Sequence, residues 1–203
     1  MKEFAPSCGS TGTRADAQRD RILCAALKCF IEHGFHAASM ASIAEAAQMS
    51  AGLIYRYFEN KHAIVLAIVQ RQLEEKRVLI RELHASDQFA DDLLQAFEEW
   101  CASEATTMSV ALMLEMSAEA TRNPQIAEAL HDSDEVTRVE FQRWLMRSAE
   151  QGGMGFDERE AERRALEMRL IVDGLAIRGA REPGIDRTVL RAALGRLVDR
   201  ALS

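Results

Sequence analysis

The sequence predicts an all-α protein, and three observations lead to this fold class. Only three prolines, Pro6, Pro124 and Pro183, occur in 203 residues. The rest of the chain is rich in Ala, Leu, Glu and Arg, which are good helix formers. Apolar residues also recur three and four positions apart through most of the chain, which is the spacing of one helix face.

Nine helices are expected, and the breaks between them follow from local sequence. The first helix places Ile22, Leu27 and Phe30 on its apolar face and is expected to stop at Gly34. A short second helix begins after Ser39, a residue that caps free backbone N–H groups, and a short third helix follows after a three-residue break. The expected ranges are 15–33, 40–47, 51–58, 61–84, 88–104, 108–122, 124–151, 157–181 and 186–202.

The later helices are delimited in the same way. Asn60 is a suitable cap for the long helix that starts at Lys61, and Pro124 fits the first position of another long helix. A glycine-rich loop at residues 152–155 ends that helix, and a Pro-Gly turn separates the last two. We therefore expect a flexible tail at residues 1–13, a three-helix domain at residues 14–60 and a larger helical domain at residues 61–203.

The net charge of −7 is distributed unevenly along the chain. Residues 1–70 hold seven Lys/Arg and six Asp/Glu, a balance of +1, whereas residues 71–203 hold eighteen and twenty-six, a balance of −8. The acidic residues therefore lie downstream, and the N-terminal part is able to present a local basic face. Because +1 is a weak excess, the case for a nucleic-acid partner depends on a motif.

Such a motif lies in the two short helices on either side of residues 48–50. Two short helices joined by a three-residue turn have the geometry of a helix-turn-helix, whose second helix enters the major groove of DNA. Ala44 and Ala47 allow the two helices to pack closely. The second helix starts with small residues, which suits a helix end that presses against DNA with its N–H groups directed at phosphate.

An ordered set of residues lies within positions 20–66. The set comprises Gly34, Phe35, Ser39, Ile43, Ala44, Ser50, Gly52, Ile54, Tyr55, Tyr57, Phe58 and Lys61. In this order it resembles the signature of the TetR family of transcription regulators. Seen alone, the three aromatics at positions 55, 57 and 58 are explained as well by the core of a helical bundle, but the whole ordered set favours DNA binding. The resemblance implies a helix-turn-helix domain followed by a helical domain that dimerises and senses a small ligand.

The resemblance also implies a role for each residue of the motif. Tyr55 would give its hydroxyl to a DNA phosphate, Lys61 would meet a phosphate with its ammonium, and Tyr57 occupies a position that often contacts phosphate. Ser39 would cap its helix and touch the DNA backbone. The residues nearest the bases would be Ser50, Ala51, Gly52, Leu53 and Arg56. Since only one of these is a long donor, specificity is expected to depend on thymine methyl groups and on DNA shape.

Gln48 departs from the family pattern, because many members carry Gly at this position of the turn. If the backbone there has positive φ, Gln in place of Gly costs about 1 kcal/mol of stability. This lowers local stability without removing the motif.

The last two helices are expected to form a dimer interface. They carry apolar residues such as Leu170, Ile177, Leu190 and Leu197. In the TetR family such a pair packs against its twofold mate as a four-helix bundle, and two half-sites raise the affinity for DNA. The alternative is that these residues form an intramolecular core.

The ligand site is less visible in the sequence. Large or flexible apolar residues of the middle helices suit an adaptable pocket, although each suits an ordinary core as well. Glu115 and Glu119 lie on one helical face, where they either attract a cationic ligand or, as we expect, face solvent. Asp134 and Thr137 either line a cavity or mark where their helix meets water. The candidate ligand residues are Trp100, Met113, Glu115, Met116, Asp134, Thr137, Phe141 and Trp144.

The sequence thus predicts a ligand-responsive repressor that binds a palindromic or pseudo-palindromic operator in double-stranded DNA as a homodimer and is released by a small-molecule inducer. A co-repressed or activating member of the same family and an acidic helical module for protein–protein interaction are the alternatives. No HExxH, GxSxG, Walker, dinucleotide or CxxC motif occurs, so we expect no catalysis, metal or cofactor. No apolar run approaches the ~20 residues that span a bilayer, and we expect a cytoplasmic protein that binds no membrane.

Overall fold

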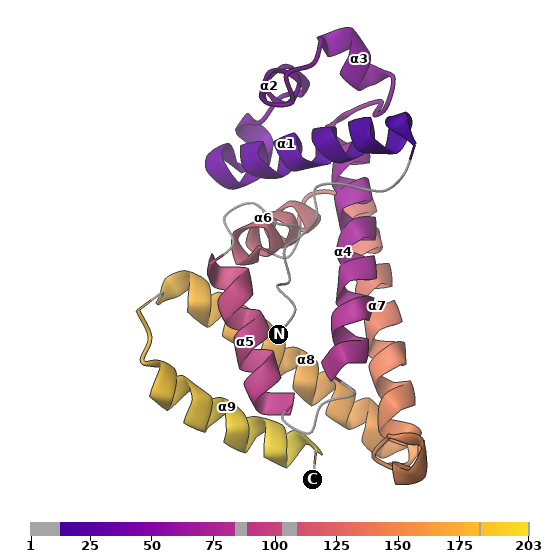
Figure 1. Ribbon diagram of the computed structural model, residues 1–203, viewed down its shortest axis with the longest axis vertical. Coiled ribbons are helices and arrows are strands. Elements are labelled where there is room, and N and C mark those ends of the chain that lie inside the picture. The colour runs from indigo at the N-terminus through magenta and orange to yellow at the C-terminus, as the bar shows by residue number, and fades with distance from the viewer. Residues whose placement is uncertain (1–12, 84–88, 103–108, 183, 203) are drawn as a thin grey trace. The chain divides into compact units, whose positions relative to one another are not determined.

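A computed structural model describes residues 13–83, 89–102, 109–182 and 184–202 of the chain (Figure 1). These residues form nine α-helices, one short 3-10 helix and no strand, which confirms the predicted fold class. The α-helices are α1 (Arg14–Ala37), α2 (Met40–Ala46), α3 (Ala51–Tyr55), α4 (Lys61–Leu83), α5 (Phe89–Ala102), α6 (Val110–Ala120), α7 (Pro124–Met146), α8 (Glu158–Arg181) and α9 (Arg187–Leu202).

The predicted breaks and caps are found at several helix ends. Gly34 interrupts α1 with φ 78° and ψ 160°, so regular helix stops there as expected and a last short turn carries the chain to Ala37. Asn60 accepts a hydrogen bond from the Ala63 N–H (2.9 Å) in the first turn of α4. Asn123 caps α7 in the same way, accepting from the Gln125 N–H at 3.0 Å.

The predicted end of α7 at residue 151 is wrong, because the helix stops at Met146. A 3-10 helix (Ala149–Gln151) follows, and Gly152 then adopts a left-handed conformation with φ 71°. A Cβ atom on Gly153 would lie 2.3 Å from the Arg147 carbonyl oxygen, so the close turn requires glycine there. The helix therefore ends before the glycine-rich loop rather than at it.

The chain divides into two compact units, each with its own core. The first unit comprises residues 1–72 and 103–130, and the second comprises residues 73–102 and 131–203. The long helices α4 and α7 contribute residues to both units. The domain boundaries expected at residues 13 and 60 stay a prediction.

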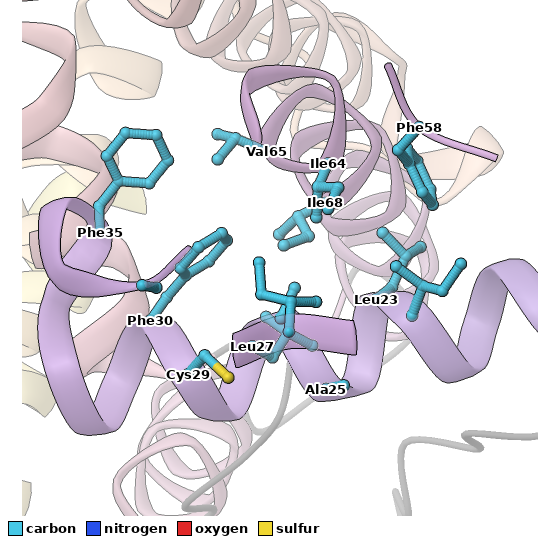
Figure 2. Close-up of a cluster of buried hydrophobic side chains, with 14 of the residues drawn as sticks. Leu23, Ala25, Leu27, Cys29, Phe30, Phe35, Phe58, Ile64, Val65 and Ile68 are labelled. Atoms are coloured by element: carbon cyan, nitrogen blue, oxygen red, sulfur yellow. The ribbon is translucent and has the colours of Figure 1, made fainter. Parts of the chain in front are cut away.

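The core of the first unit joins α1, α4 and α6 to the two short helices. Figure 2 shows side chains of α1, among them Leu27 and Phe30, facing Ile64 and Ile68 of α4. Helices as short as α2 and α3 are not stable alone in water. They are held by Ile43 and Ile54, whose side chains are completely buried in this core.

The core of the second unit is formed by α5, α7, α8 and α9. Phe97 and Leu145 are completely buried in it, and α9 contributes Leu194 and Val198. The buried Arg164 of α8 donates a hydrogen bond to the Ala201 carbonyl (2.7 Å) near the end of α9. A cation at the C-terminal end of a helix is favourable, so this arginine helps to fix α9 on α8.

Candidate DNA-binding and effector sites

The helix-turn-helix begins each of its helices with a serine cap. The Ser39 hydroxyl accepts from the Ser42 N–H at 3.0 Å, and the Ser42 hydroxyl accepts in return from the Ser39 N–H at 2.8 Å. Ser50 accepts from the Leu53 N–H at 3.2 Å. These hydrogen bonds confirm the predicted capping role of Ser39. Ser39 and Ser50 are both exposed. The contact of Ser39 with DNA stays a prediction.

The outward side of α3 presents most of the residues that are predicted to lie nearest the bases. Ala51, Gly52 and Arg56 are exposed, and 54% of the Tyr55 side chain is accessible. Leu53 is half-buried, whereas Ile54 on the opposite side is completely buried. The Tyr55 hydroxyl and the Arg56 guanidinium are therefore carried on the solvent side of a helix that the core holds firmly.

Two arginines of α1, which the sequence reasoning did not identify, brace this motif. Arg19 donates to the Tyr57 carbonyl at 3.4 Å and lies with its guanidinium 4.5 Å from the centre of the Phe58 ring. Arg21 donates to both the carbonyl and the side-chain oxygen of Gln48, at 3.3 Å each. Gln48 lies 27 positions after Arg21, and Tyr57 lies 38 positions after Arg19. Because these separations are long, the local spacing of the sequence contains no signal for the contacts.

Gln48 adopts a positive φ of 53°, the backbone conformation in which Gln in place of Gly is expected to cost stability. Among the described residues it is the only one other than glycine in this region of backbone conformation. Its N–H donates to the Glu45 carbonyl at 2.9 Å, so the turn is tied to the end of α2. The strain expected of a residue with a Cβ atom is therefore present in the turn itself.

Lys61 directs its ammonium toward the protein rather than away from it. Its Nζ donates to the Phe35 carbonyl at 2.5 Å and to the Ala38 carbonyl at 2.8 Å, and it lies 4.3 Å from the centre of the Phe35 ring. Burial lowers the pKa of Lys61, and the negative charge of Glu119 partly opposes this effect. The lysine thus holds the C-terminal end of α1, while its predicted phosphate contact stays a prediction.

The two glutamates of α6 do not face solvent together, contrary to our expectation. Glu119 is only 6% exposed, and its Oε2 lies 3.0 Å from His36 Nε2 without a hydrogen bond of good geometry within the described chain. Glu115 is half-buried and accepts a hydrogen bond from the Phe35 N–H at 3.1 Å. Both carboxylates therefore contact the C-terminal end of α1, where the Phe35 carbonyl also accepts a hydrogen bond from Lys61.

Two of the three candidate ligand residues of α6, Glu115 and Met116, line a small, largely apolar pocket in the first unit. Met116 is buried at its wall, and Met113 is half-buried on the same helix. The lining residues are Phe30, Phe35, Val65, Ile68, Leu112, Glu115, Met116 and Glu119.

The other described candidates lie in the second unit and have partners of their own. Asp134 forms ion pairs with Lys76 (3.6 Å) and Arg169 (2.9 Å), and Thr137 bonds to the Asp134 carbonyl at 2.8 Å. Phe141 and Trp144 are buried with ring centres 5.3 Å apart. The side chain of Trp100 lies outside the described part of the structure. The candidates are thus divided between the two units.

The arrangement of ionisable and apolar residues in the described part of the chain bears on two further classes of site. No group of three or more His, Cys, Asp and Glu residues there has an arrangement that could hold a metal ion. Within the same residues, no helix is long and apolar enough to cross a membrane.

Comparisons with known proteins agree with this architecture. The model of the bacterial regulatory proteins of the tetR family matches residues 22–68, and that of the C-terminal domain of BetI-type transcriptional repressors matches residues 89–203. The chain is 35% identical to the HTH-type transcriptional regulator UidR of Escherichia coli (strain K12) over 145 residues, 70% of each chain. A shorter match, 37% over 59 residues, covers 29% of this chain and 27% of the HTH-type transcriptional activator FasR of Mycolicibacterium smegmatis.

A solved structure of Salmonella enterica GusR is similar over nearly the whole molecule. It is 29% identical, the TM-score is 0.74, and the match covers 94% of this chain and 100% of GusR. An exposed, serine-capped helix-turn-helix in front of a larger helical domain defines a DNA-binding transcription regulator. With the two family matches and the relation to UidR, the chain belongs to the TetR family of bacterial regulatory proteins.

Proposed function

We propose that this regulator is a repressor that binds a palindromic or pseudo-palindromic operator as a homodimer and leaves it when a small-molecule inducer binds. The observation that carries the proposal is the exposed side of α3, where Tyr55 and Arg56 stand out from a buried Ile54. A residue layout of this kind suits phosphate and base contacts from one helix in the major groove. Binding to operator DNA in a bacterium implies a cytoplasmic protein.

The homodimer is supported by apolar residues that the single chain leaves uncovered. Leu166 and Leu170 of α8 and Val189 and Leu197 of α9 are each more than half exposed. A group of large exposed apolar side chains on neighbouring helices is typical of an interaction surface. Two copies joined there would present two helix-turn-helix motifs to two half-sites, which is why the operator is proposed to be symmetric.

The inducer is proposed to act by favouring a conformation that binds the operator weakly. Helix α4 is suited to transmit such a change, because it contributes to both compact units and Lys61 at its start holds the C-terminal end of α1. The effector residues named above remain candidates for its binding site. A co-repressed or activating regulator is the second candidate function, since FasR is named an activator.

The proposal is tested by the affinity of the purified protein for the DNA directly upstream of its own gene, at about 50 and 200 mM salt. Wild type is compared with Tyr55→Phe, Arg56→Ala and, as a control of equal charge change, Arg143→Ala on the exposed side of α7. We expect tight binding that weakens with salt. Arg56→Ala should weaken binding by about 1–3 kcal/mol, whereas Arg143→Ala should leave it unchanged.

Whether the protein represses or activates its promoter is then read from reporter expression. Deletion of the gene should raise transcription from the bound promoter if the protein is a repressor, and should lower it if the protein is an activator. Equal effects of Arg56→Ala and Arg143→Ala would contradict the assignment of α3 as the reading helix.

A further inference from the structure

The turn between α2 and α3 keeps a strained residue where glycine would be relaxed. Gln48 has φ 53° and is the only residue other than glycine with positive φ in the described part of the chain. It is exposed, so packing in the core does not require a glutamine there. Glycine would adopt the same backbone conformation at a lower cost. A strained residue beside a binding surface indicates that its side chain has a role that offsets the strain.

Arg21 of α1 contacts Gln48 through two oxygen atoms. The Nη2 atom of Arg21 donates to the main-chain carbonyl and to the side-chain Oε1 of Gln48, at 3.3 Å each. The residues that follow Arg21, Ile22 and Leu23, are buried in the core of the first unit. Arg21 therefore projects from a firmly packed part of α1, and its planar guanidinium has donors in fixed directions. The side chain of Gln48 adds a second acceptor to this contact, which glycine would lack.

This contact lies directly before the helix that is proposed to read the bases. Met49 follows Gln48 and donates its N–H to the Ala44 carbonyl at 2.9 Å, and Ser50 then caps α3. Helix α3 has five residues, of which only Ile54 is buried. A helix this short is not stable alone, so its direction depends on the contacts that hold its two ends.

The other end of α3 is held from the same helix. Arg19 of α1 donates to the Tyr57 carbonyl at 3.4 Å, two residues after α3 ends. Helix α1 thus contacts the chain just before α3 and just after it. Contacts with base edges depend on the placement of side chains to within about 0.5 Å, so the orientation of α3 determines how well its residues can distinguish one base pair from another.

We propose that Arg21 and Gln48 are positioning residues for sequence recognition: the strained glutamine is kept because its side-chain oxygen, bound by Arg21, fixes the start of α3 in the orientation that reads the bases. This inference rests on the DNA binding of the proposed function and deepens it. Neither residue has to contact DNA itself. The residue at position 48 that is best for stability, glycine, is therefore not the one that is best for recognition.

The test measures discrimination, which is the dissociation constant for a shuffled duplex divided by that for an operator selected from random DNA with the wild-type protein. Gln48→Gly and Gln48→Met remove the side-chain acceptor, and each should lower discrimination about fivefold or more, the effect of one hydrogen bond. Gln48→Gly should do so although its free energy of unfolding in urea is no lower than that of wild type, because glycine relieves the strain. A merely structural role would not lower discrimination in a protein that is no less stable.

A conservative variant tests whether the acceptor oxygen is what matters. Gln48→Glu keeps an oxygen atom at the same distance from the main chain, so it should keep discrimination within about twofold of wild type. Its added negative charge should weaken binding to the operator and to the shuffled duplex alike, and this effect cancels in the ratio.

Arg21→Met tests the donor in the same assay. Lys28→Met, on an exposed position of α1, is the control for the lost positive charge and should leave discrimination unchanged. If Arg21 and Gln48 act together, the double variant Arg21→Met/Gln48→Met should discriminate no worse than Arg21→Met alone.

The outcomes separate this inference from the function on which it rests. A wild-type protein that enriches no sequence from random DNA would overturn sequence-specific binding and the inference together. A wild-type protein that selects an operator, with full discrimination retained by Gln48→Gly or with independent losses from Arg21→Met and Gln48→Met, would overturn the positioning role and leave the DNA-binding function intact. Reduced discrimination in Gln48→Gly and Gln48→Met, but not in Gln48→Glu, is the expected result.

Discussion

Single residues of the first unit carry strain and contacts that have measurable consequences for stability. Gln48 holds a left-handed conformation that glycine adopts more easily, at φ 53°. Gln48→Gly should therefore raise the free energy of unfolding by about 0.5–1 kcal/mol, reduced by the loss of the side-chain bond from Arg21. Gln48→Ala is the control, since it removes the same bond and keeps the Cβ atom. Urea denaturation that ranks Gln48→Ala at or above Gln48→Gly would contradict this account.

Lys61 shows how a residue of the family signature acquires a structural role. Its ammonium donates to the Phe35 and Ala38 carbonyls, so Lys61→Met should lower the free energy of unfolding by about 1–3 kcal/mol. Lys28→Met, which removes an exposed lysine of α1, should change stability little. If Lys61 also binds phosphate, a folded Lys61→Met protein should show a salt slope of DNA binding reduced by about one. Equal unfolding free energies for both variants would contradict the structural role.

At the scale of elements, the carboxylates of α6 bind it to the C-terminal end of α1. Glu115→Ala should lower the free energy of unfolding by about 1–3 kcal/mol, because the Phe35 N–H loses its acceptor. Glu128→Ala is a control on an exposed position of α7 and should change stability by less than about 0.5 kcal/mol. Denaturation of the two variants under one set of conditions checks the difference, and an unaffected Glu115→Ala protein would show that the contact is not maintained in solution.

The elements also show what the sequence predicts and what it does not. Helical periodicity, the cap Asn60 and the first-position Pro124 predicted the nine helices of the described residues, because caps and apolar faces are local properties. The orientation of Glu119 was not predicted, because its burial depends on contacts with α1, more than eighty residues away. The bracing of the turn by Arg21 is missed for the same reason, since it is a contact between distant segments.

At the scale of the whole molecule, a half-buried charge in the second unit makes stability depend on pH. Burial lowers the pKa of Lys76 below its ordinary value of 10.5, and Asp134 opposes this effect only in part. The unfolded chain therefore binds this proton more tightly than the folded protein between the lowered pKa and 10.5. Stability contributed by Lys76 should accordingly rise as pH rises through that window.

Lys76→Met and Lys76→Arg test this dependence, because neither side chain titrates in the window. Relative to both variants, the wild-type protein should gain unfolding free energy as the pH approaches 10.5. A smaller rise should remain in the variants, since burial lowers the pKa of Lys61 in the same direction. Parallel stability profiles of wild type and both variants in urea would show that Lys76 keeps its ordinary pKa in the folded protein.

The whole molecule is proposed to read DNA sequence as a symmetric dimer, and selection from a pool of random double-stranded DNA tests this proposal most directly. We expect enrichment of an inverted repeat whose two half-sites lie one helical turn, about 10 base pairs, or a multiple of it apart. Arg56→Ala should reduce enrichment at individual positions within each half-site. A pool that stays random after repeated selection, or that enriches a single unpaired half-site, would contradict sequence-specific binding by a twofold dimer.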